Sequence, residues 1–384
     1  MGILNLREVA DRINLAINQK EKIILFADAD LDGVASLLIL QEAIYGMGGT
    51  VNLACFPNRE EEGYGLNLKA LGKFKNEAPA LLITLDCGIS NFEEIKQAKK
   101  DGFTVIVVDH HQVLGKVPPE AFLVVDPKQE GDLYPFKNLS NTGIVYHLAK
   151  LVMGGSFSNL LNQSFLELAT LATIADMMEE QQDNKMIIEK GLSTIIKTQR
   201  PGLLAIVEVC NSENLSVRQV VQKIIGVLNI TEFKKGLPEN YSLLSMASFE
   251  EAGGLAERLN RLSKERYLVI GATVAMAEQI ISEDPTSFEK IIFLGKDDWV
   301  QVLTGAIASR LCNKYQKPTF VFKISKEIIR GSLRTPRGVD GVTALKQCHK
   351  YLEMYGGHQQ AAGFSLKTKN LEKFRKCLLD FFNQ

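Results

Sequence analysis

The chain has 384 residues, of which 46% are hydrophobic and 23% charged, and its formal net charge is −1. This length exceeds what one compact core usually holds, so we expect two domains. The near-zero net charge excludes a uniformly basic nucleic-acid-binding protein, so any site for a polyanion must be a local patch.

The six cysteines are scattered along the chain and form neither a CxxC pair nor a zinc-ligand spacing. We therefore expect buried thiols in a reducing compartment. The first residues, MGILNLREVADRI, carry charges where a signal peptide needs an apolar core. No apolar run reaches ~18 residues, the length that a membrane span requires. These features predict a cytoplasmic protein without a membrane span.

Short apolar segments alternate with helical segments in the N-terminal part of the chain. The expected strands are 22–27, 50–56, 80–85, 103–108 and 122–126. Strands that alternate with helices indicate a parallel sheet covered on both faces, so the predicted fold class is α/β. Binding sites in such sheets lie beyond the carboxyl ends of the strands.

The rest of the chain has a different pattern. Residues 140–285 are mostly helical, and strands return at 291–294, 319–324 and 361–366, with a helix expected at 302–315. A second, smaller α/β domain is therefore predicted to begin near residue 240. Residues 229–242 show the least regular pattern and are a candidate hinge.

Acidic residues and histidines follow several of these segments. They are Asp28, Asp30 and Asp32 after the first strand, Asp86 after the third, Asp109, His110 and His111 after the fourth, and Asp176 after the helical run LELATLATIA. Carboxylates gathered at one sheet edge raise each other's pKa unless cations neutralise them. Oxygen ligands with one or two imidazoles suit Mn²⁺ or Mg²⁺, and two such ions favour hydrolysis at phosphorus.

Each motif has a simpler explanation when it is taken alone. DADLDG could be a calcium-type loop or a solvated turn, Asp-Cys-Gly could be a turn, and paired histidines are often structural. Similarly, Asn141-Thr142-Gly143 could offer N–H groups to a phosphate or could be an ordinary helix cap. Packing does not explain why the acidic motifs occur together, so we interpret that set as a metal site.

The same segments resemble a known family. In order, ADADLDG, TLDCGIS, VVDHH and ATIADMM resemble the four motifs of the DHH phosphoesterases. Near the C-terminus, YGGHQQAAGFSL resembles the Gly-Gly-His motif of the DHH-associated substrate domain. Within that superfamily, FPNREEEGYGLN, TGAIASRLCNKYQKPTFVF and GSLRTPRGVDGVTAL are similar to segments of the RecJ single-strand-specific exonucleases. The resemblance covers nearly the whole chain.

The resemblance implies a domain organisation and a set of metal ligands. A DHH catalytic domain would cover 1–190, a helical linker 191–240, and a DHH-associated substrate-binding domain 241–384. The implied ligands of two Mn²⁺ or Mg²⁺ ions are Asp30, Asp32, Asp86, His110 and Asp176, with Asp28 as a further ligand or a neighbour of the ligands. Asp109 would orient the histidine pair, and His111 would meet the phosphate, so these two are the catalytic candidates.

The resemblance also implies a substrate-binding set. Its members are Arg59, Tyr64, Arg310, Ser332, Arg334, Gly356, Gly357 and His358. Arg59, Ser332 and Arg334 would grip a terminal 5′ phosphate, because guanidinium groups match phosphate oxygens. Residues 310–350 contain ten Lys or Arg residues but only Glu327 and Asp340 as acids. This segment is the local basic patch that the net charge conceals.

The chain departs from the family pattern in three places. Phe26 stands where some DHH proteins carry a histidine ligand, so Asp28 could complete that shell. No Gly-Arg pair follows Asn229, and the family's Trp-His-x-Gly segment reads Trp299-Val300-Gln301-Val302 here. Bacterial RecJ proteins continue into an OB-fold after the Gly-Gly-His motif, so we expect this chain to be a catalytic core that lacks the OB-fold.

These features predict a metal-dependent 5′→3′ exonuclease that acts on single-stranded DNA in repair or recombination and releases 5′-mononucleotides. Single-strand-binding or replication and repair proteins are expected partners. One alternative is a phosphodiesterase of the same superfamily that acts on very short RNAs or dinucleotides. Another is a non-catalytic RecJ-like scaffold in a replication assembly, although such proteins usually lose the metal aspartates.

Overall fold

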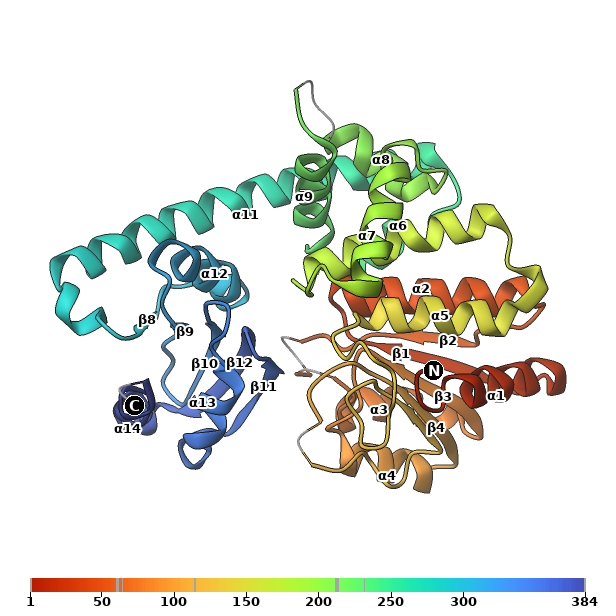
Figure 1. The fold of residues 1–384 in the computed structure, drawn as a ribbon, viewed down its shortest axis with the longest axis horizontal. Coiled ribbons are helices and arrows are strands. Elements are labelled where there is room, and N and C mark those ends of the chain that lie inside the picture. Colours follow the sequence, from red (N-terminus) through yellow and green to blue (C-terminus); the bar gives the residue numbers. More distant parts are fainter. Residues whose placement is uncertain are drawn as a thin grey trace. The chain divides into compact units, whose positions relative to one another are not determined.

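The computed structural model describes residues 2–382 except 60–61, 64, 114, 211–213 and 231. The chain divides into two compact units, Met1–Ser263 and Lys264–Gln384 (Figure 1). Each unit has its own sheet, and the long helix α11 (Phe249–Glu283) runs through the division. No helix among the described residues is long and apolar enough to cross a membrane.

The sheet of the first unit is entirely parallel, with strand order β2-β1-β3-β4-β5. The strands are β1 (Ile23–Ala27), β2 (Leu53–Cys55), β3 (Ala80–Leu85), β4 (Phe103–Val108) and β5 (Leu123–Val125). All five were expected from the sequence, so the α/β fold class is confirmed. Because every strand is parallel, the carboxyl ends of β1, β3, β4 and β5 lie along one edge.

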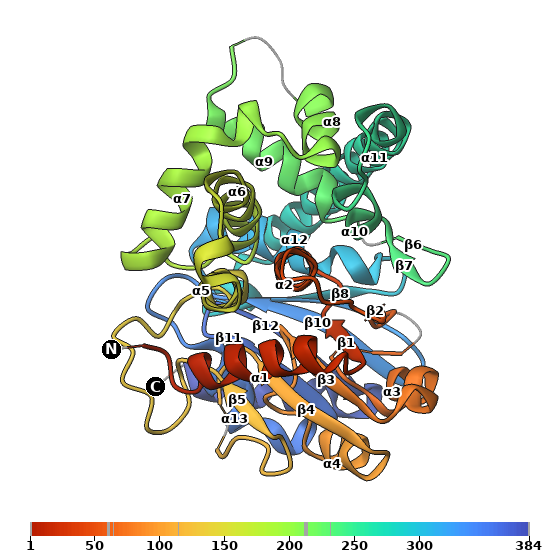
Figure 2. The ribbon, with the colours of Figure 1, turned by 90° about the vertical axis from the view of Figure 1, so that its right-hand side faces the viewer.

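Helices cover both faces of this sheet (Figure 2). One face packs on α1 (Leu6–Gln19), α2 (Leu31–Gly46), α5 (Asn141–Met153) and α6 (Asn159–Ala175), and the other on α3 (Leu68–Phe74) and α4 (Phe92–Lys100). Within β1, Ile23 and Leu25 point to the first core, whereas Ile24 and Phe26 point to the second. This burial on both faces explains why the strands are continuous apolar runs rather than alternating ones.

Helices also dominate the rest of the first unit. They are α7 (Gln182–Thr194), α8 (Pro201–Cys210), α9 (Val217–Leu228) and α10 (Glu239–Leu244), with a hairpin of β6 (Phe233–Lys234) and β7 (Leu237–Pro238). The candidate hinge at 229–242 contributes this hairpin and the start of α10. The expected linker at 191–240 lies inside the first unit, and the functional boundaries at 190 and 240 stay predictions.

The sheet of the second unit is mixed, with strand order β11-β12-β10-β9-β8. Its strands are β8 (Ile292–Lys296), β9 (Thr319–Lys323), β10 (Ile328–Arg334), β11 (Met354–His358) and β12 (Ala361–Lys367). One face packs on α11 and α12 (Thr304–Tyr315), and the other on α13 (Gly341–Gln347) and α14 (Leu371–Phe382). Strands β10 and β11 were not expected, because GSLR and the Gly-Gly pair lack an apolar run.

One expectation about the cysteines is wrong. Cys348, directly after α13, forms a disulfide with Cys377 in α14, with a Cα–Cα distance of 6.0 Å. Their separation of 29 residues concealed the pair in the sequence, because α13 and α14 meet only through tertiary packing on β12. Among the described residues the other four cysteines form no disulfide, as expected, and three of them are buried.

Candidate metal centre

The loop after β1 carries the first acidic group. Asp30 caps the N-terminus of α2, and its Oδ1 accepts a hydrogen bond from Gly33 N–H at 3.1 Å. Asp28 precedes it, and its Oδ1 accepts the N–H of Ala29 at 2.8 Å. Phe26 packs against Phe74, so its side chain points into the apolar core and does not take the place of a metal ligand. Phe26 therefore anchors β1 in the core, and the carboxylates of Asp28 and Asp30 lie beyond the carboxyl end of that strand.

Arg59 holds this acidic loop. Its guanidinium lies 2.7 Å from Asp28 Oδ2 and 2.8 Å from Asp30 Oδ2. Burial alone would raise the pKa of Asp30, but the charge of Arg59 and the Gly33 N–H outweigh it and lower that pKa. The predicted contact of Arg59 with a 5′ phosphate stays a prediction, whereas its contact with the two aspartates is a feature of this structure.

Asp32 is buried beneath the N-terminus of α5. The N–H groups of Asn141 and Thr142 donate to its two carboxylate oxygens at 2.9 and 2.8 Å, and the Thr142 hydroxyl donates to the same group. These N–H groups therefore orient a carboxylate, and the phosphate-binding alternative considered for Asn141-Thr142-Gly143 is wrong. Burial raises the pKa of Asp32 to about 6, although the Thr142 hydrogen bonds oppose the shift.

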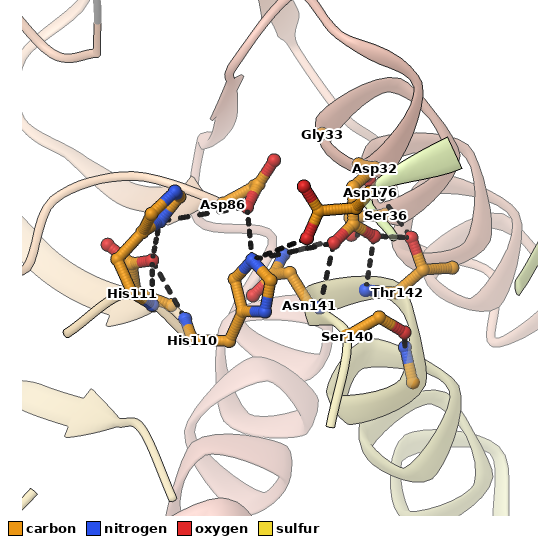
Figure 3. A network of polar contacts seen from close by, with 12 residues as sticks. Asp32, Gly33, Ser36, Asp86, His110, His111, Ser140, Asn141, Thr142 and Asp176 are labelled. Atoms are coloured by element: carbon orange, nitrogen blue, oxygen red, sulfur yellow. Dashed lines mark hydrogen bonds and ion pairs between the residues drawn. The ribbon is translucent and has the colours of Figure 1, made fainter. Parts of the chain in front are cut away.

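Asp86 and His110 bring the ends of β3 and β4 together (Figure 3). His110 Nδ1 lies 3.1 Å from the carbonyl oxygen of Leu139, which directs Nε2 toward the carboxylates. That Nε2 is 3.1 Å from Asp86 Oδ1 and 3.6 Å from oxygens of both Asp32 and Asp176. Asp176 reaches this point from the C-terminal end of α6.

Asp109 organises the histidine pair. Its Oδ1 accepts the backbone N–H groups of His110 and His111 at 2.8 and 3.1 Å, and it lies 2.7 Å from His111 Nδ1. Its Oδ2 accepts the N–H of Ile89 at 3.0 Å. Burial lowers the pKa of His111, but the Asp109 carboxylate outweighs burial and raises that pKa to about 9. Asp109 thus has the orienting geometry that the sequence predicted.

The electrostatics of the cluster favour added cations. Burial, followed by repulsion from neighbouring aspartates, raises the pKa of both Asp86 and Asp176 well above the ordinary value. Burial also lowers the pKa of His110, so its ring is neutral and available as a ligand. A bound divalent cation would reverse the carboxylate shifts, because it stabilises the ionised form.

Two groups of three side chains match the donor set of divalent ions. Ligand atoms of Asp32, His110 and Asp176 lie within 4.8 Å of one another, and so do those of Asp86, Asp109 and His111. Oxygen donors with one imidazole in each group suit Mn²⁺ or Mg²⁺. The two groups contain four of the six predicted ligands together with Asp109 and His111, which were predicted in other roles. The remaining two, Asp28 and Asp30, are paired with Arg59, and the ligand set stays a prediction.

Gly33 is the one position of the acidic loop where a methyl group has no room. A Cβ there would lie 2.2 Å from the carbonyl oxygen of Asp28. We expect Gly33→Ala to displace the loop, lower the free energy of unfolding by roughly 1–3 kcal/mol and abolish metal-dependent activity. Thermal unfolding and activity assays check this, with Gly72→Ala as the control, since nothing lies within 4 Å of that Cβ. Full activity in Gly33→Ala would contradict the constraint.

The substrate-binding candidates of the second unit lie on its sheet and on α12. Ser332 and Arg334 alternate along β10, where the Ser332 hydroxyl is 3.0 Å from that of Thr304 and Arg334 Nε donates to Ser309 at 3.2 Å. Arg310 stacks on Tyr267, with 4.4 Å between the guanidinium carbon and the ring centroid. Arg334 therefore lies against α12, whereas Arg310 of that helix contacts α11, and the substrate roles of both stay predictions.

The Gly-Gly-His motif forms part of an edge strand. Gly356, Gly357 and His358 lie in β11 and pair with β12. Gly357 has a φ of 133°, and a Cβ there would lie 2.4 Å from the carbonyl oxygen of Ala361, so its backbone requires glycine. Gly356 has open space around it, which permits close approach of a ligand. Tyr64 lies outside the described residues.

Sequence reasoning missed several residues that support the cluster. Ser140 caps α5 by accepting the N–H of Gly143 at 3.1 Å, which fixes the helix end that holds Asp32. Asp126 and Lys128 follow β5, as other acidic residues follow β1, β3 and β4. Applying the same strand-end pattern to the segment VVDPK would have identified them.

Two family models match the chain. Residues 22–173 match the DHH family, N-terminal domain, and residues 288–384 match the DHHA1 domain. The first match contains every strand-end aspartate and histidine of the cluster and ends shortly before Asp176. The chain therefore contains a DHH domain followed by a DHHA1 domain.

Within this family the chain is similar to RecJ proteins. It is 32% identical to the single-stranded-DNA-specific exonuclease RecJ of Bacillus subtilis, over 97% of this chain and 47% of that protein. It is 29% identical to the RecJ of Thermus thermophilus, over 98% of this chain and 54% of that protein. The chain thus spans about half the length of these two relatives.

Solved structures support the same assignment. A crystal structure of exonuclease RecJ bound to manganese is 28% identical, with a TM-score of 0.78 over 100% of this chain and 96% of that one. The Mn²⁺ complex of Thermus thermophilus RecJ has a TM-score of 0.83 at 23% identity, over 100% of this chain and 55% of that one, and shows the shared fold. The predicted resemblance is confirmed.

Proposed function

We propose that the chain hydrolyses phosphodiester bonds of single-stranded nucleic acid, with DNA preferred, and requires Mn²⁺ or Mg²⁺. The observation that carries this proposal is the pair of three-residue ligand groups at one edge of the parallel sheet. The names of the RecJ relatives and the manganese in a similar structure support it. The non-catalytic alternative is disfavoured, because all the expected metal aspartates are present and those of both ligand groups gather at that edge.

Asp32, His110 and Asp176 would hold one ion, and Asp86 and Asp109 with the His111 ring beside them would hold the other, with Asp28 and Asp30 adjacent. Such ions supply a nucleophile at neutral pH and stabilise negative charge on the phosphate oxygens. The protein fixes these groups through the α5 N–H groups on Asp32 and the backbone bonds to Asp109. In the metal-free chain Asp109 outweighs burial and raises the pKa of His111 to about 9, which favours the protonated ring that a contact with a phosphate oxygen would use.

The position of His111 suits either a metal ligand or a contact with the phosphate, and we propose that it contacts the phosphate. Its Nδ1 lies 2.7 Å from Asp109 Oδ1, so the carboxylate that orients the ring also favours its positive charge, which suits an anionic phosphate. We expect His111→Gln to lower kcat by about 10²-fold or more with little change in Mn²⁺ affinity. His110→Gln is the comparison and should lose Mn²⁺ affinity. A large loss of Mn²⁺ affinity in His111→Gln would instead make this histidine a ligand.

We further propose 5′→3′ polarity and release of 5′-mononucleotides, with roles in DNA repair or recombination. This proposal adopts the roles that the family resemblance implies for Arg59, Ser332 and Arg334, because guanidinium groups match phosphate oxygens. Partners of the single-strand-binding or replication and repair kinds, and a cytoplasmic location, belong to the same proposal.

Digestion of oligonucleotides tests the proposed function. The substrates are single strands of DNA and RNA with a 5′ phosphate, with a blocked 5′ end or with a blocked 3′ end, together with a dinucleotide. The proposal predicts mononucleotides from the 5′-phosphorylated DNA strand with Mn²⁺ or Mg²⁺, and protection by the 5′ block. Cleavage of the dinucleotide alone would favour the small-substrate phosphodiesterase, and no cleavage with either metal would reject catalysis.

A further inference from the structure

Lys128 contacts the metal centre from a turn that the proposed mechanism does not use. The turn Asp126-Pro127-Lys128 directly follows β5, the strand next to β4. Asp126 is buried, its Oδ1 accepts the backbone N–H of Lys128 at 2.7 Å, and its carbonyl oxygen accepts the N–H of Gln129 at 3.0 Å. The base of the Lys128 side chain is therefore fixed by its own turn.

The end of that side chain reaches the histidine pair. Lys128 Nζ donates a hydrogen bond to the carbonyl oxygen of His110. This carbonyl belongs to the peptide that joins His110 to His111, and the two rings belong to different ligand groups. A shift of this one peptide would therefore change the direction of both imidazoles.

Other contacts of the histidine pair involve its N–H groups and rings, and Lys128 bonds the His110 carbonyl. The carboxylate of Asp109 accepts the backbone N–H groups of both histidines. The His110 ring is held separately, with Nδ1 3.1 Å from the carbonyl oxygen of Leu139. The Asp109 N–H itself donates to Val125 O at 3.0 Å, which ties this turn to the end of β5. The bond from Lys128 to the His110 carbonyl is a second link between the histidine turn and the segment that follows β5.

The charge of Lys128 is costly at this position. Burial lowers the pKa of its amine, and the nearby acids that oppose this shift are Asp126, Asp109 and Asp176. An ammonium group on a flexible four-carbon chain is usually solvated, and its partial burial opposes folding unless it is bonded and paired. If this side chain only filled space, an apolar side chain of similar length would do so without the cost of burying a charge.

We propose that Lys128 is a positioning residue that holds the His110–His111 peptide, and thereby aligns the two ligand groups with each other. The inference rests on the proposed function, since it concerns the same metal centre. Its action is indirect, because the bond goes to a backbone oxygen and leaves both rings for metal and phosphate. Lys128→Met removes the hydrogen bond and the charge while keeping the length of the chain, and Lys128→Arg retains a donor.

Two measurements test the role of Lys128. The first is Mn²⁺ binding, followed by the electron paramagnetic resonance signal of free Mn²⁺, and the second is the rate of digestion of the 5′-phosphorylated DNA strand. We expect Lys128→Met to weaken Mn²⁺ binding or lower kcat by about 10- to 100-fold, with KM and the melting temperature little changed. Lys128→Arg should recover part of the loss.

The control is Lys137→Met. Lys137 also bonds a backbone carbonyl in the same segment, that of Asp132 at 2.8 Å, but it takes no part in the ligand groups. Wild-type Mn²⁺ affinity and kcat in Lys128→Met would overturn the inference while leaving the proposed function intact. A wild-type chain that binds Mn²⁺ but digests nothing would reject the proposed function, and the Mn²⁺ comparison would still decide the role of Lys128. A wild-type chain that binds no Mn²⁺ would reject both.

Discussion

Asp86→Asn is expected to abolish digestion of single-stranded DNA, with a loss in kcat of at least about 10³-fold, or roughly 4 kcal/mol of transition-state stabilisation. Asp86 Oδ1 lies 3.1 Å from His110 Nε2 and 3.9 Å from His111 Nδ1, so this carboxylate stands between the two ligand groups. The amide keeps the shape of the side chain but removes the negative charge and one ligand oxygen. Initial rates at saturating Mn²⁺ measure the effect.

The same substitution should make the metal-free protein more stable. Burial and the neighbouring aspartates raise the pKa of Asp86, which means that its ionised form is disfavoured in the folded chain. Removal of that charge at pH 7.5 is therefore expected to raise the melting temperature, as is common when a catalytic charge is lost. Asp101→Asn, in the turn after α4, is the control and should leave both activity and melting temperature unchanged. An active Asp86→Asn variant would contradict the proposed site.

Mn²⁺ is expected to stabilise the chain strongly at pH 7.5 and weakly at pH 5. The folded pKa of Asp32 is raised to about 6, and those of Asp86 and Asp176 are raised well above the ordinary value. Metal binding must displace the protons that these groups hold, so affinity falls as the pH falls through their pKa values. Saturation at 100 times the dissociation constant adds about 2.7 kcal/mol per site to the free energy of unfolding.

The metal-free protein should show the opposite trend with pH. A carboxyl group whose pKa is raised on folding contributes stability below its unfolded pKa and loses it as the pH rises through the folded value. For Asp32 that window runs from the ordinary pKa of 3.8 to the folded pKa of about 6. Melting temperatures at pH 5 and 7.5, with and without Mn²⁺, test both trends, and Asp86→Asn should reduce the difference. Equal stabilisation by Mn²⁺ at the two pH values would contradict the coupling of metal and proton binding.

The sequence was sufficient for the strands of the parallel sheet and for the acidic residues that follow them. Buried parallel strands are continuous apolar runs, and a carboxylate directly after such a run must lie at the sheet edge. The positions of Asp86 and His110 could therefore be predicted, and the structure places their side chains 3.1 Å apart. Asp176 follows a helix rather than a strand, so the strand-end rule does not place it, and it was singled out from the helical run that precedes it.

The supporting contacts could not be predicted in the same way. The bonds from Asn141 and Thr142 to Asp32 join residues more than 100 positions apart, and their own sequence is typical of any helix start. Strand β10 was missed because Arg330, Ser332 and Arg334 occupy alternate positions, so its apolar residues never form a run. The Cys348–Cys377 bond was missed because it depends on how α13 and α14 pack.

The central claim is that this one cluster holds two divalent ions. Anomalous diffraction from crystals grown with Mn²⁺ tests it most directly, because the signal locates the metal without reference to the protein atoms. We expect one peak among Asp32, His110 and Asp176 and a second beside Asp86 and Asp109. Peaks elsewhere, or none at this edge of the sheet, would contradict it.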